Sequence, residues 1–125
     1  MAITTSTASN PLITTISVDT DCDTTVEAAA SGNKTLYAVE IINPNATEDV
    51  YVHIVNAASS DNPTTASQHN SQFYCPANTT IYYYAPAGYI TDTGLSLYCT
   101  TSAGGGQSAS APTENVTVTL GYTAR

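Results

Sequence analysis

The sequence predicts an all-β fold, namely an antiparallel β-sandwich of the jelly-roll or Ig-like type with seven to eight short strands. Several short segments alternate apolar and polar residues with a period of two, as strands with one buried face do. Turn residues such as Asn43-Pro44 and Pro76-Ala77-Asn78 separate these segments. The length of 125 residues fits one domain. Short strands divided by turns are typical of sandwiches and barrels.

The chain begins with a stretch rich in Thr and Ser, residues 1–11, which ends at Pro11. Its β-branched residues favour an extended backbone. We therefore expect an extended N-terminal arm in front of a single sandwich domain over residues 12–125. Such an arm is disordered alone and can add a strand to the sheet edge of a neighbouring subunit. Ile3 and Thr5 are its expected contact residues.

Alternation in the rest of the chain predicts the strands of the sandwich. They are expected at residues 12–18, 34–44, 48–58, 71–75, 79–85, 94–100 and 116–122. The side chains expected to point inward are Tyr37, Val39 and Ile41, then Val50, Val52 and Ile54, and last Val116, Val118, Leu120 and Tyr122. Residues 24–30 stay open, because their Ala run favours helix whereas their length and Gly32 favour a short strand or turn. The last two strands are expected to form a hairpin.

Two polar segments are predicted as loops. Residues 57–70 show no periodicity, and the three glycines from Gly104 to Gly106 are followed by small polar residues. Such a stretch buries too little apolar surface to offset its ordering entropy, so we expect it to be mobile and exposed. A phosphate-binding loop would need a helix N-terminus and usually a Lys behind the glycines, and neither follows here.

The charge of the chain is strongly acidic. Ten acidic residues stand against Lys34 and Arg125, which gives a net charge of −8 at pH 7. A nucleic-acid-binding protein needs a basic surface that displaces counterions from phosphates. Anionic membranes attract basic segments in the same way. We therefore expect no nucleic-acid partner and no membrane partner.

Compartment and cysteine state are predicted together. The N-terminus, MAITTSTASN, lacks the basic and apolar regions of a signal peptide. We therefore expect the chain to stay in the cytoplasm where it is made, or to leave it by lysis or with a particle. Cys22, Cys75 and Cys99 are odd in number and have no CxxC spacing. Buried free thiols are the expectation in a reducing compartment, and a Cys75–Cys99 disulfide is the alternative.

Asp19, Asp21 and Asp23 form the most suggestive metal-ligand group, because they share one face of an extended segment. An EF-hand loop starting at Asp19 needs Gly at its sixth position and Glu at its twelfth, and Thr24 and Ala30 stand there instead. We interpret the segment as an exposed acidic edge or turn, which also discourages edge-to-edge strand pairing.

Two histidines, His53 and His69, are candidates for catalytic or zinc-binding residues. His53 is expected to be exposed on the polar face of a strand, and His69 lies in the long loop. Neither has the spacing of a zinc site or of a nucleophile with its base. We predict no catalytic residue, no metal site and no cofactor.

The segment IYYYAPAGY, residues 81–89, concentrates aromatic residues on a strand. Tyr83 shares a face with Ile81, so Tyr82 and Tyr84 point the other way. Tyr is enriched at protein interfaces because it combines apolar area with a hydrogen-bonding tip. We expect Tyr82, Tyr84 and Tyr89 to contribute to an interface, with a sheet buried on both faces as the alternative.

From about residue 48 onward, the pattern resembles small virion proteins of tailed phages of the capsid decoration or cement type. The segments that carry the resemblance are VYVHIVNAAS, CPANTTIYYYAPAG, TGLSLYCTT and APTENVTVTLGY, in this order. They are strand and turn elements that contain no catalytic residue and extend over more than half of the chain. The resemblance implies a β-sandwich on the capsid surface that binds the major capsid protein, usually as a homotrimer around a symmetry axis.

We therefore expect a structural virion protein and no enzyme. Leu, Ile, Val and Phe together make up only 22 of 125 residues, and so thin a core gains stability from oligomerisation or other partners. The alternative is a carbohydrate-binding or adhesin-like sandwich, in which Tyr82, Tyr84 and Tyr89 stack on sugars.

Overall fold

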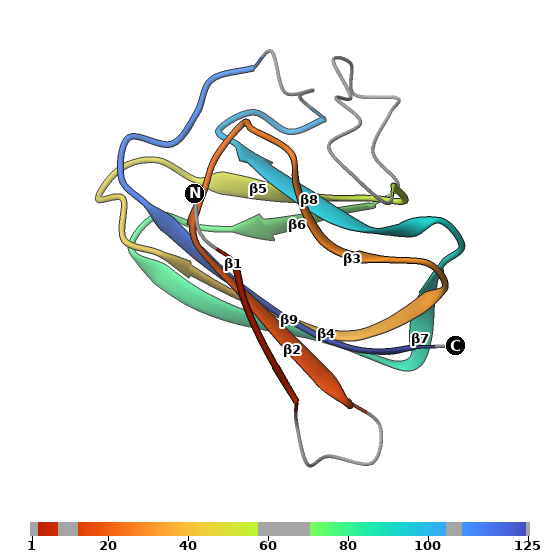
Figure 1. Cartoon of the computed structure of the whole chain (residues 1–125). Helices are drawn as coiled ribbons and strands as arrows, with labels where there is room; N and C mark the ends of the chain where they lie inside the picture. The colour runs from red at the N-terminus through yellow and green to blue at the C-terminus, as the bar shows by residue number, and fades with distance from the viewer. Residues whose placement is uncertain (1–2, 8–12, 58–70, 105–108, 125) are drawn as a thin grey trace.

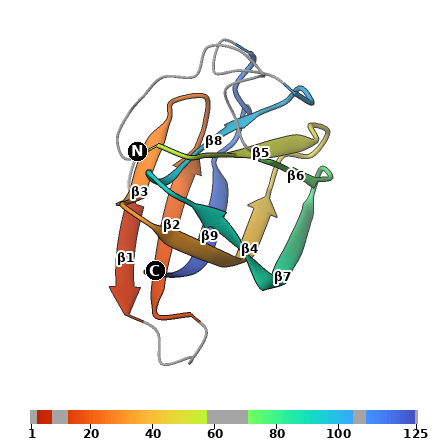
Figure 2. The ribbon, with the colours of Figure 1, turned by 90° about the vertical axis from the view of Figure 1, so that its right-hand side faces the viewer.

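A computed structural model of the chain describes residues 3–7, 13–57, 71–104 and 109–124. These residues form nine strands in two antiparallel sheets that pack face to face (Figures 1 and 2). Sheet A has the order β1-β2-β9-β4-β7, with the bounds Ile3–Thr7 (β1), Thr15–Cys22 (β2), Val116–Ala124 (β9), Lys34–Asn43 (β4) and Thr79–Thr91 (β7). Sheet B has the order β3-β8-β5-β6, with the bounds Glu27–Ser31 (β3), Gly94–Thr100 (β8), Val50–Val55 (β5) and Ser71–Cys75 (β6).

The strands β2 to β9 follow the jelly-roll order. Along the chain they cross from one sheet to the other at every step except from β5 to β6. Two four-stranded sheets connected in this way make a jelly roll, and β1 adds a fifth strand at the edge of sheet A. The predicted antiparallel sandwich is confirmed. The strand count is higher than expected because β1 and β3 both form, and β3 resolves the ambiguity of residues 24–30.

The predicted C-terminal hairpin is wrong. β8 lies between β3 and β5 in sheet B, whereas β9 lies between β2 and β4 in sheet A. Alternation identifies a strand and its buried face, but it does not identify the sheet that the strand joins. All seven residues of β8 are buried, so this strand is enclosed on both faces.

The N-terminal residues differ from the expected unpaired arm. Ile3–Thr7 is extended, as predicted, but it pairs antiparallel with β2 of the same chain. Ile3 packs against the core, and Thr5 Oγ1 lies 2.9 Å from Ser17 Oγ. β-branched residues favour pairing with any available sheet edge, and here the chain's own edge strand supplies it.

The core lies between the two sheets. The inward-facing residues predicted for β5 and β9 are all buried there. Tyr37 is the exception among the predicted inward residues, because the strand register shifts between Leu36 and Ala38. This bulge turns Leu36 into the core and leaves Tyr37 half-buried.

All three cysteines are free and buried, as expected. The predicted polar loop at 57–70 lies outside the described residues except for Ala57. The same holds for His69 and for residues 105–108 of the predicted glycine loop.

Candidate interaction surface

Two cross-strand rows of side chains shape the outer face of sheet A, which is the face turned away from sheet B. The first row consists of Ile16, Gly121, Ala38 and Tyr84, on β2, β9, β4 and β7 in that order. Its two central residues are small and its two outer residues are large. The sheet surface is therefore hollow along the middle of this row.

The second row lies beside the first on the same four strands. It consists of Val18, Thr119, Glu40 and Tyr82. This row adds a second tyrosine to the β7 side and places one carboxylate, that of Glu40, next to the hollow.

Together the rows form a groove of about 210 Å³, which we call the outer groove. Its lining residues are Ile13, Ile16, Ala38, Val39, Glu40, Tyr82, Tyr84, Thr119 and Gly121. Pockets for drug-sized ligands begin at roughly 300 Å³. The outer groove is thus better matched to one long side chain of another protein than to a bound cofactor.

The tyrosine wall of the groove is well exposed. Tyr82 and Tyr84 have 57% and 71% of their surface exposed, and their rings lie nearly parallel, with centroids 6.4 Å apart. A hydrogen bond with Glu40 raises the pKa of Tyr82 above its usual value, because the neutral phenol is the better partner for a carboxylate. The two side chains point outward as predicted, and the alternative of a sheet buried on both faces is wrong.

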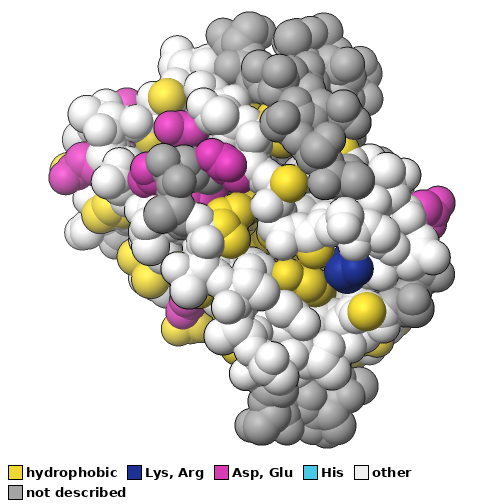
Figure 3. All heavy atoms as spheres, in the orientation of Figure 1, with side chains coloured by type: hydrophobic (Ala, Val, Ile, Leu, Met, Phe, Trp, Pro, Cys, Tyr) yellow, Lys and Arg dark blue, Asp and Glu magenta, His cyan; other side chains and the backbone are white. Residues whose placement is uncertain are grey.

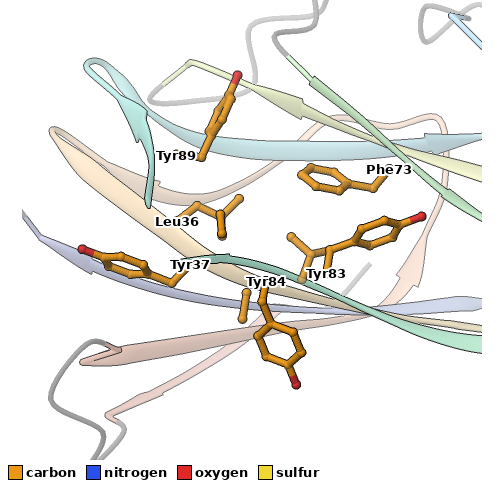
Figure 4. A pocket seen from close by; sticks show the side chains of 9 residues that line it. Leu36, Tyr37, Phe73, Tyr83, Tyr84 and Tyr89 are labelled. Carbon is orange, nitrogen blue, oxygen red and sulfur yellow. The ribbon is translucent and has the colours of Figure 1, made fainter. Parts of the chain in front are cut away.

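The opposite side of β7 faces the interior. A smaller cavity of about 110 Å³ lies there, and Phe73 and Tyr83 contact each other beside it, with ring centroids 5.2 Å apart. Figure 4 shows these two rings pointing toward each other, while Tyr84 projects away from them. Tyr89 also lines this cavity and packs against the core.

The five predicted interface residues therefore do not form one patch. Tyr82 and Tyr84 lie together on the outer groove, and Tyr89 lies on the other side of the same strand. Ile3 and Thr5 are on β1, which is the opposite edge of sheet A from β7. Ile13 precedes β2, and the remaining groove residues come from β2, β4 and β9; sequence reasoning missed all of them. A glycine inside a strand, as at Gly121, is the one signal that could have pointed there.

The predicted exposed acidic edge is wrong at Asp19, which is only 1% exposed. Its neighbour on the inner face of β2, Ser17, lies 2.7 Å from the hydroxyl of Tyr122. The Asp19 Oδ1 atom accepts a hydrogen bond of 3.1 Å from the Asp21 amide, whereas Oδ2 has no hydrogen-bond partner among the described residues. Burial, with a smaller contribution from neighbouring carboxylates, raises the pKa of Asp19 to about 7.

The three aspartates do not converge on one point, because the register shifts between Asp19 and Cys22. In the part of the chain that the structure describes, no three His, Cys, Asp or Glu side chains are grouped so that they could hold a metal ion.

His53 is not an exposed strand residue, contrary to the prediction. It has no exposed surface, its ring stacks on Tyr98 with centroids 4.5 Å apart, and its Nε2 lies 2.8 Å from Thr100 Oγ1. A period-two pattern predicts which way His53 points but not whether that face is covered.

The charged side chains are unevenly distributed. On the face seen in Figure 3, the acidic side chains gather mainly toward one end of the molecule, and the single basic side chain lies toward the other. Lys34 is the only basic residue among those that the structure describes, since Arg125 lies outside them. None of the described segments forms a helix with the length and apolar character needed to cross a membrane.

Comparisons of the chain with known protein families, with curated proteins and with solved structures gave no match. Any functional assignment must therefore come from the surface and from the sequence motifs.

Proposed function

We propose that the protein is a structural virion protein that decorates or cements the capsid of a tailed phage. It binds the major capsid protein through the outer face of sheet A, and it acts as a homo-oligomer, with a trimer favoured by the resemblance described above. The observation that carries the proposal is the apolar character of this one face. Among the residues that the structure describes, four of the five exposed large hydrophobic side chains lie on it, namely Ile42, Tyr82, Tyr84 and Ile90.

An exposed apolar patch of this kind marks an interaction site in a soluble protein. Tyrosines suit such a site because they bring large contact area at low entropic cost. The jelly-roll order also supports the proposal, since viral capsid domains use this fold. The same fold serves many other functions, so the proposal depends mainly on the surface and on the strand motifs from residue 48 onward.

A carbohydrate-binding module is the second candidate, because the nearly parallel rings of Tyr82 and Tyr84 could stack on sugars. The fold does not separate the two candidates, since lectin domains also include jelly rolls. The depth of the groove and its apolar floor favour a protein partner, because sugars carry hydroxyl groups that need several polar partners.

Co-sedimentation with phage heads tests the proposal. Heads of the phage that carries this gene, prepared without the protein, are mixed with increasing amounts of purified protein, and the bound fraction is measured. We expect saturable binding that the double variant Tyr82→Ala/Tyr84→Ala weakens by at least about tenfold, because truncating an aromatic residue at the energetic centre of an interface costs about 2 kcal/mol or more.

The matched control is Tyr74→Ala, which removes a tyrosine that is 39% exposed on β6 in sheet B. This variant should bind heads like the unmodified protein. Absence of saturable binding would contradict the proposal, as would equal losses in the Tyr74 and the Tyr82/Tyr84 variants. Binding to a glycan array without binding to heads would favour the carbohydrate-binding alternative.

A further inference from the structure

The outer groove combines an apolar surface, an aromatic surface and a carboxylate. Its floor and one wall are apolar, formed by Ala38, Gly121 and Ile16, and the other wall consists of the two tyrosine rings. Glu40 supplies a carboxylate at the same place, directly opposite Tyr82 in the strand register.

The depth of the groove depends on Gly121. A Cβ atom at this position would lie 3.0 Å from Ile13 Cδ1 and 3.2 Å from Ile13 Cγ2, so even alanine would push against the side chain that borders the groove. The glycine and the neighbouring Ala38 thus keep open a space that larger residues on these two central strands would fill.

We propose that the outer groove binds an arginine side chain presented by the partner protein. Arginine has an apolar stem that packs on apolar surfaces, and a planar cation that stacks on aromatic rings and pairs with carboxylates through two hydrogen bonds. Each part of this side chain matches one part of the groove. This inference rests on the proposed function in one respect, because the proposed function identifies the partner as the major capsid protein.

Charge complementarity supports a cationic occupant. The chain carries a net charge of −8, and Lys34 is the only basic side chain in the part that the structure describes. Lys34 Nζ donates hydrogen bonds to the carbonyl groups of Ser31 and Asn33, at the start of β4. The described residues thus offer no other basic side chain to pair with Glu40, and in this proposal the cation comes from the partner protein.

The outer groove differs in degree from a second exposed pair of a tyrosine with an acid, Tyr74 and Asp49. Glu40 accepts a hydrogen bond from Tyr82, whereas both carboxylate oxygens of Asp49 are used within the chain: Oδ2 accepts a hydrogen bond of 3.1 Å from the Tyr74 hydroxyl, and Oδ1 accepts one of 3.0 Å from the Ala77 amide. An arginine would have to displace both hydrogen bonds to pair with Asp49. This second pair therefore serves as an internal comparison.

The test is a titration of the isotope-labelled full chain with N-acetyl-arginine amide, followed by amide chemical shifts at low ionic strength. We expect saturable shifts at millimolar concentrations that map to the middle of β4, β7 and β9. N-acetyl-lysine amide should bind about fivefold more weakly, because a lysine cation neither stacks as a plane nor pairs through two hydrogen bonds. The signals around Asp49 should stay unchanged.

Two variants and a control test whether the carboxylate and a tyrosine ring of the groove contribute to arginine binding. Glu40→Gln keeps the shape of the side chain but should weaken arginine binding at least about tenfold, in the range of a lost charge-assisted hydrogen bond. Tyr84→Leu keeps apolar surface but removes a ring, and should weaken binding severalfold. Ile90→Ala removes an exposed side chain of the same strand that does not line the groove, and should bind like the unmodified protein.

Equal binding of the arginine and lysine compounds would overturn the inference, and so would unchanged binding in Glu40→Gln or no saturable shift at all. Since no capsid is present, the outcome is separate from that of the head-binding experiment. Binding to heads without binding of arginine would refute this inference alone, and the reverse result would refute the proposed function alone.

Discussion

Replacing Asp19 by Asn should change how the stability of this protein depends on pH. Asp19 is buried inside the sandwich on the inner face of β2, and burial raises its pKa from 3.8 to about 7. Asn is close in size, keeps an oxygen that can accept the Asp21 amide hydrogen bond, and carries no charge at any pH. The substitution thus removes the titration while retaining the shape.

The sign and size of the effect follow from the two pKa values. Between pH 3.8 and about 7, the folded chain holds a proton on Asp19 that the unfolded chain has released. The contribution of Asp19 to the free energy of unfolding therefore falls as pH rises through this window, and this contribution is constant above it. A difference of about three pH units, at about 1.4 kcal/mol each, corresponds to a loss of about 4 kcal/mol.

Urea unfolding at several pH values from 4 to 8 measures this loss, with the free energy of unfolding obtained by linear extrapolation. The stability of Asp19→Asn relative to the unmodified protein should rise by about 4 kcal/mol from pH 4 to pH 8. Glu114→Gln is the matched control, because it removes one carboxylate from an exposed position. This control should follow the pH dependence of the unmodified protein.

A constant stability difference between Asp19→Asn and the unmodified protein across this pH range would refute the reasoning. A direct check is the carboxyl carbon signal of Asp19 in the folded protein, whose titration midpoint should lie near 7. A midpoint below 5 would show that the folded protein solvates this carboxylate.

Three further predictions concern the sandwich itself. Leu97→Ala should lower the free energy of unfolding by about 2–5 kcal/mol, since Leu97 is 1% exposed in the core. A loss below about 1 kcal/mol in urea unfolding would contradict the packing described. Gly88→Ala should lower the free energy of unfolding by on the order of 1–3 kcal/mol, because Gly88 has a φ of +82° and an added Cβ would lie 2.3 Å from Thr35 Cγ2. An unchanged melting temperature would exclude this crowding. The three buried cysteines should react with a thiol reagent only slowly in the native protein and as three equivalents after denaturation without reductant; one equivalent would indicate a disulfide.

Alternation alone predicted much of the strand structure. β6 coincides with the predicted segment 71–75 and β8 with 94–100, because apolar residues two apart and flanking turn residues mark both. The inward faces of β5 and β9 were predicted for the same reason. Local patterns of this kind depend only on a strand having one covered face.

Alternation could not predict which sheet a strand joins, where a strand has a bulge, or whether the outer face of a sheet is covered by other residues. The bulge at Leu36 to Ala38 depends on how β4 meets β7, where four residues from Ala85 to Gly88 stand opposite Tyr37. The burial of His53 depends on what covers the outer face of sheet B. Neither property is local in the sequence, and both decide where a side chain lies.

The candidate site was also predictable only in part, where its residues lie on one strand. Tyr82 and Tyr84 were predicted to point outward because they are two residues apart on one strand. Their groove partners Ile16, Ala38 and Gly121 lie on three other strands and are brought beside them by strand register. Register follows from packing between distant segments, so the groove could only be found in the folded structure.

The jelly-roll order has a consequence for the way the chain folds during synthesis. β9 inserts between β2 and β4, so that Leu120 pairs with both Ser17 and Val39, which the ribosome made long before it. Until β9 emerges, β2 and β4 have unpaired edges, and closing such long loops makes folding slow. The nascent chain therefore spends most of its synthesis with aggregation-prone edges exposed, and the outer groove does not exist until its last strand arrives. No binding to a partner through this groove can begin before translation of β9 is complete.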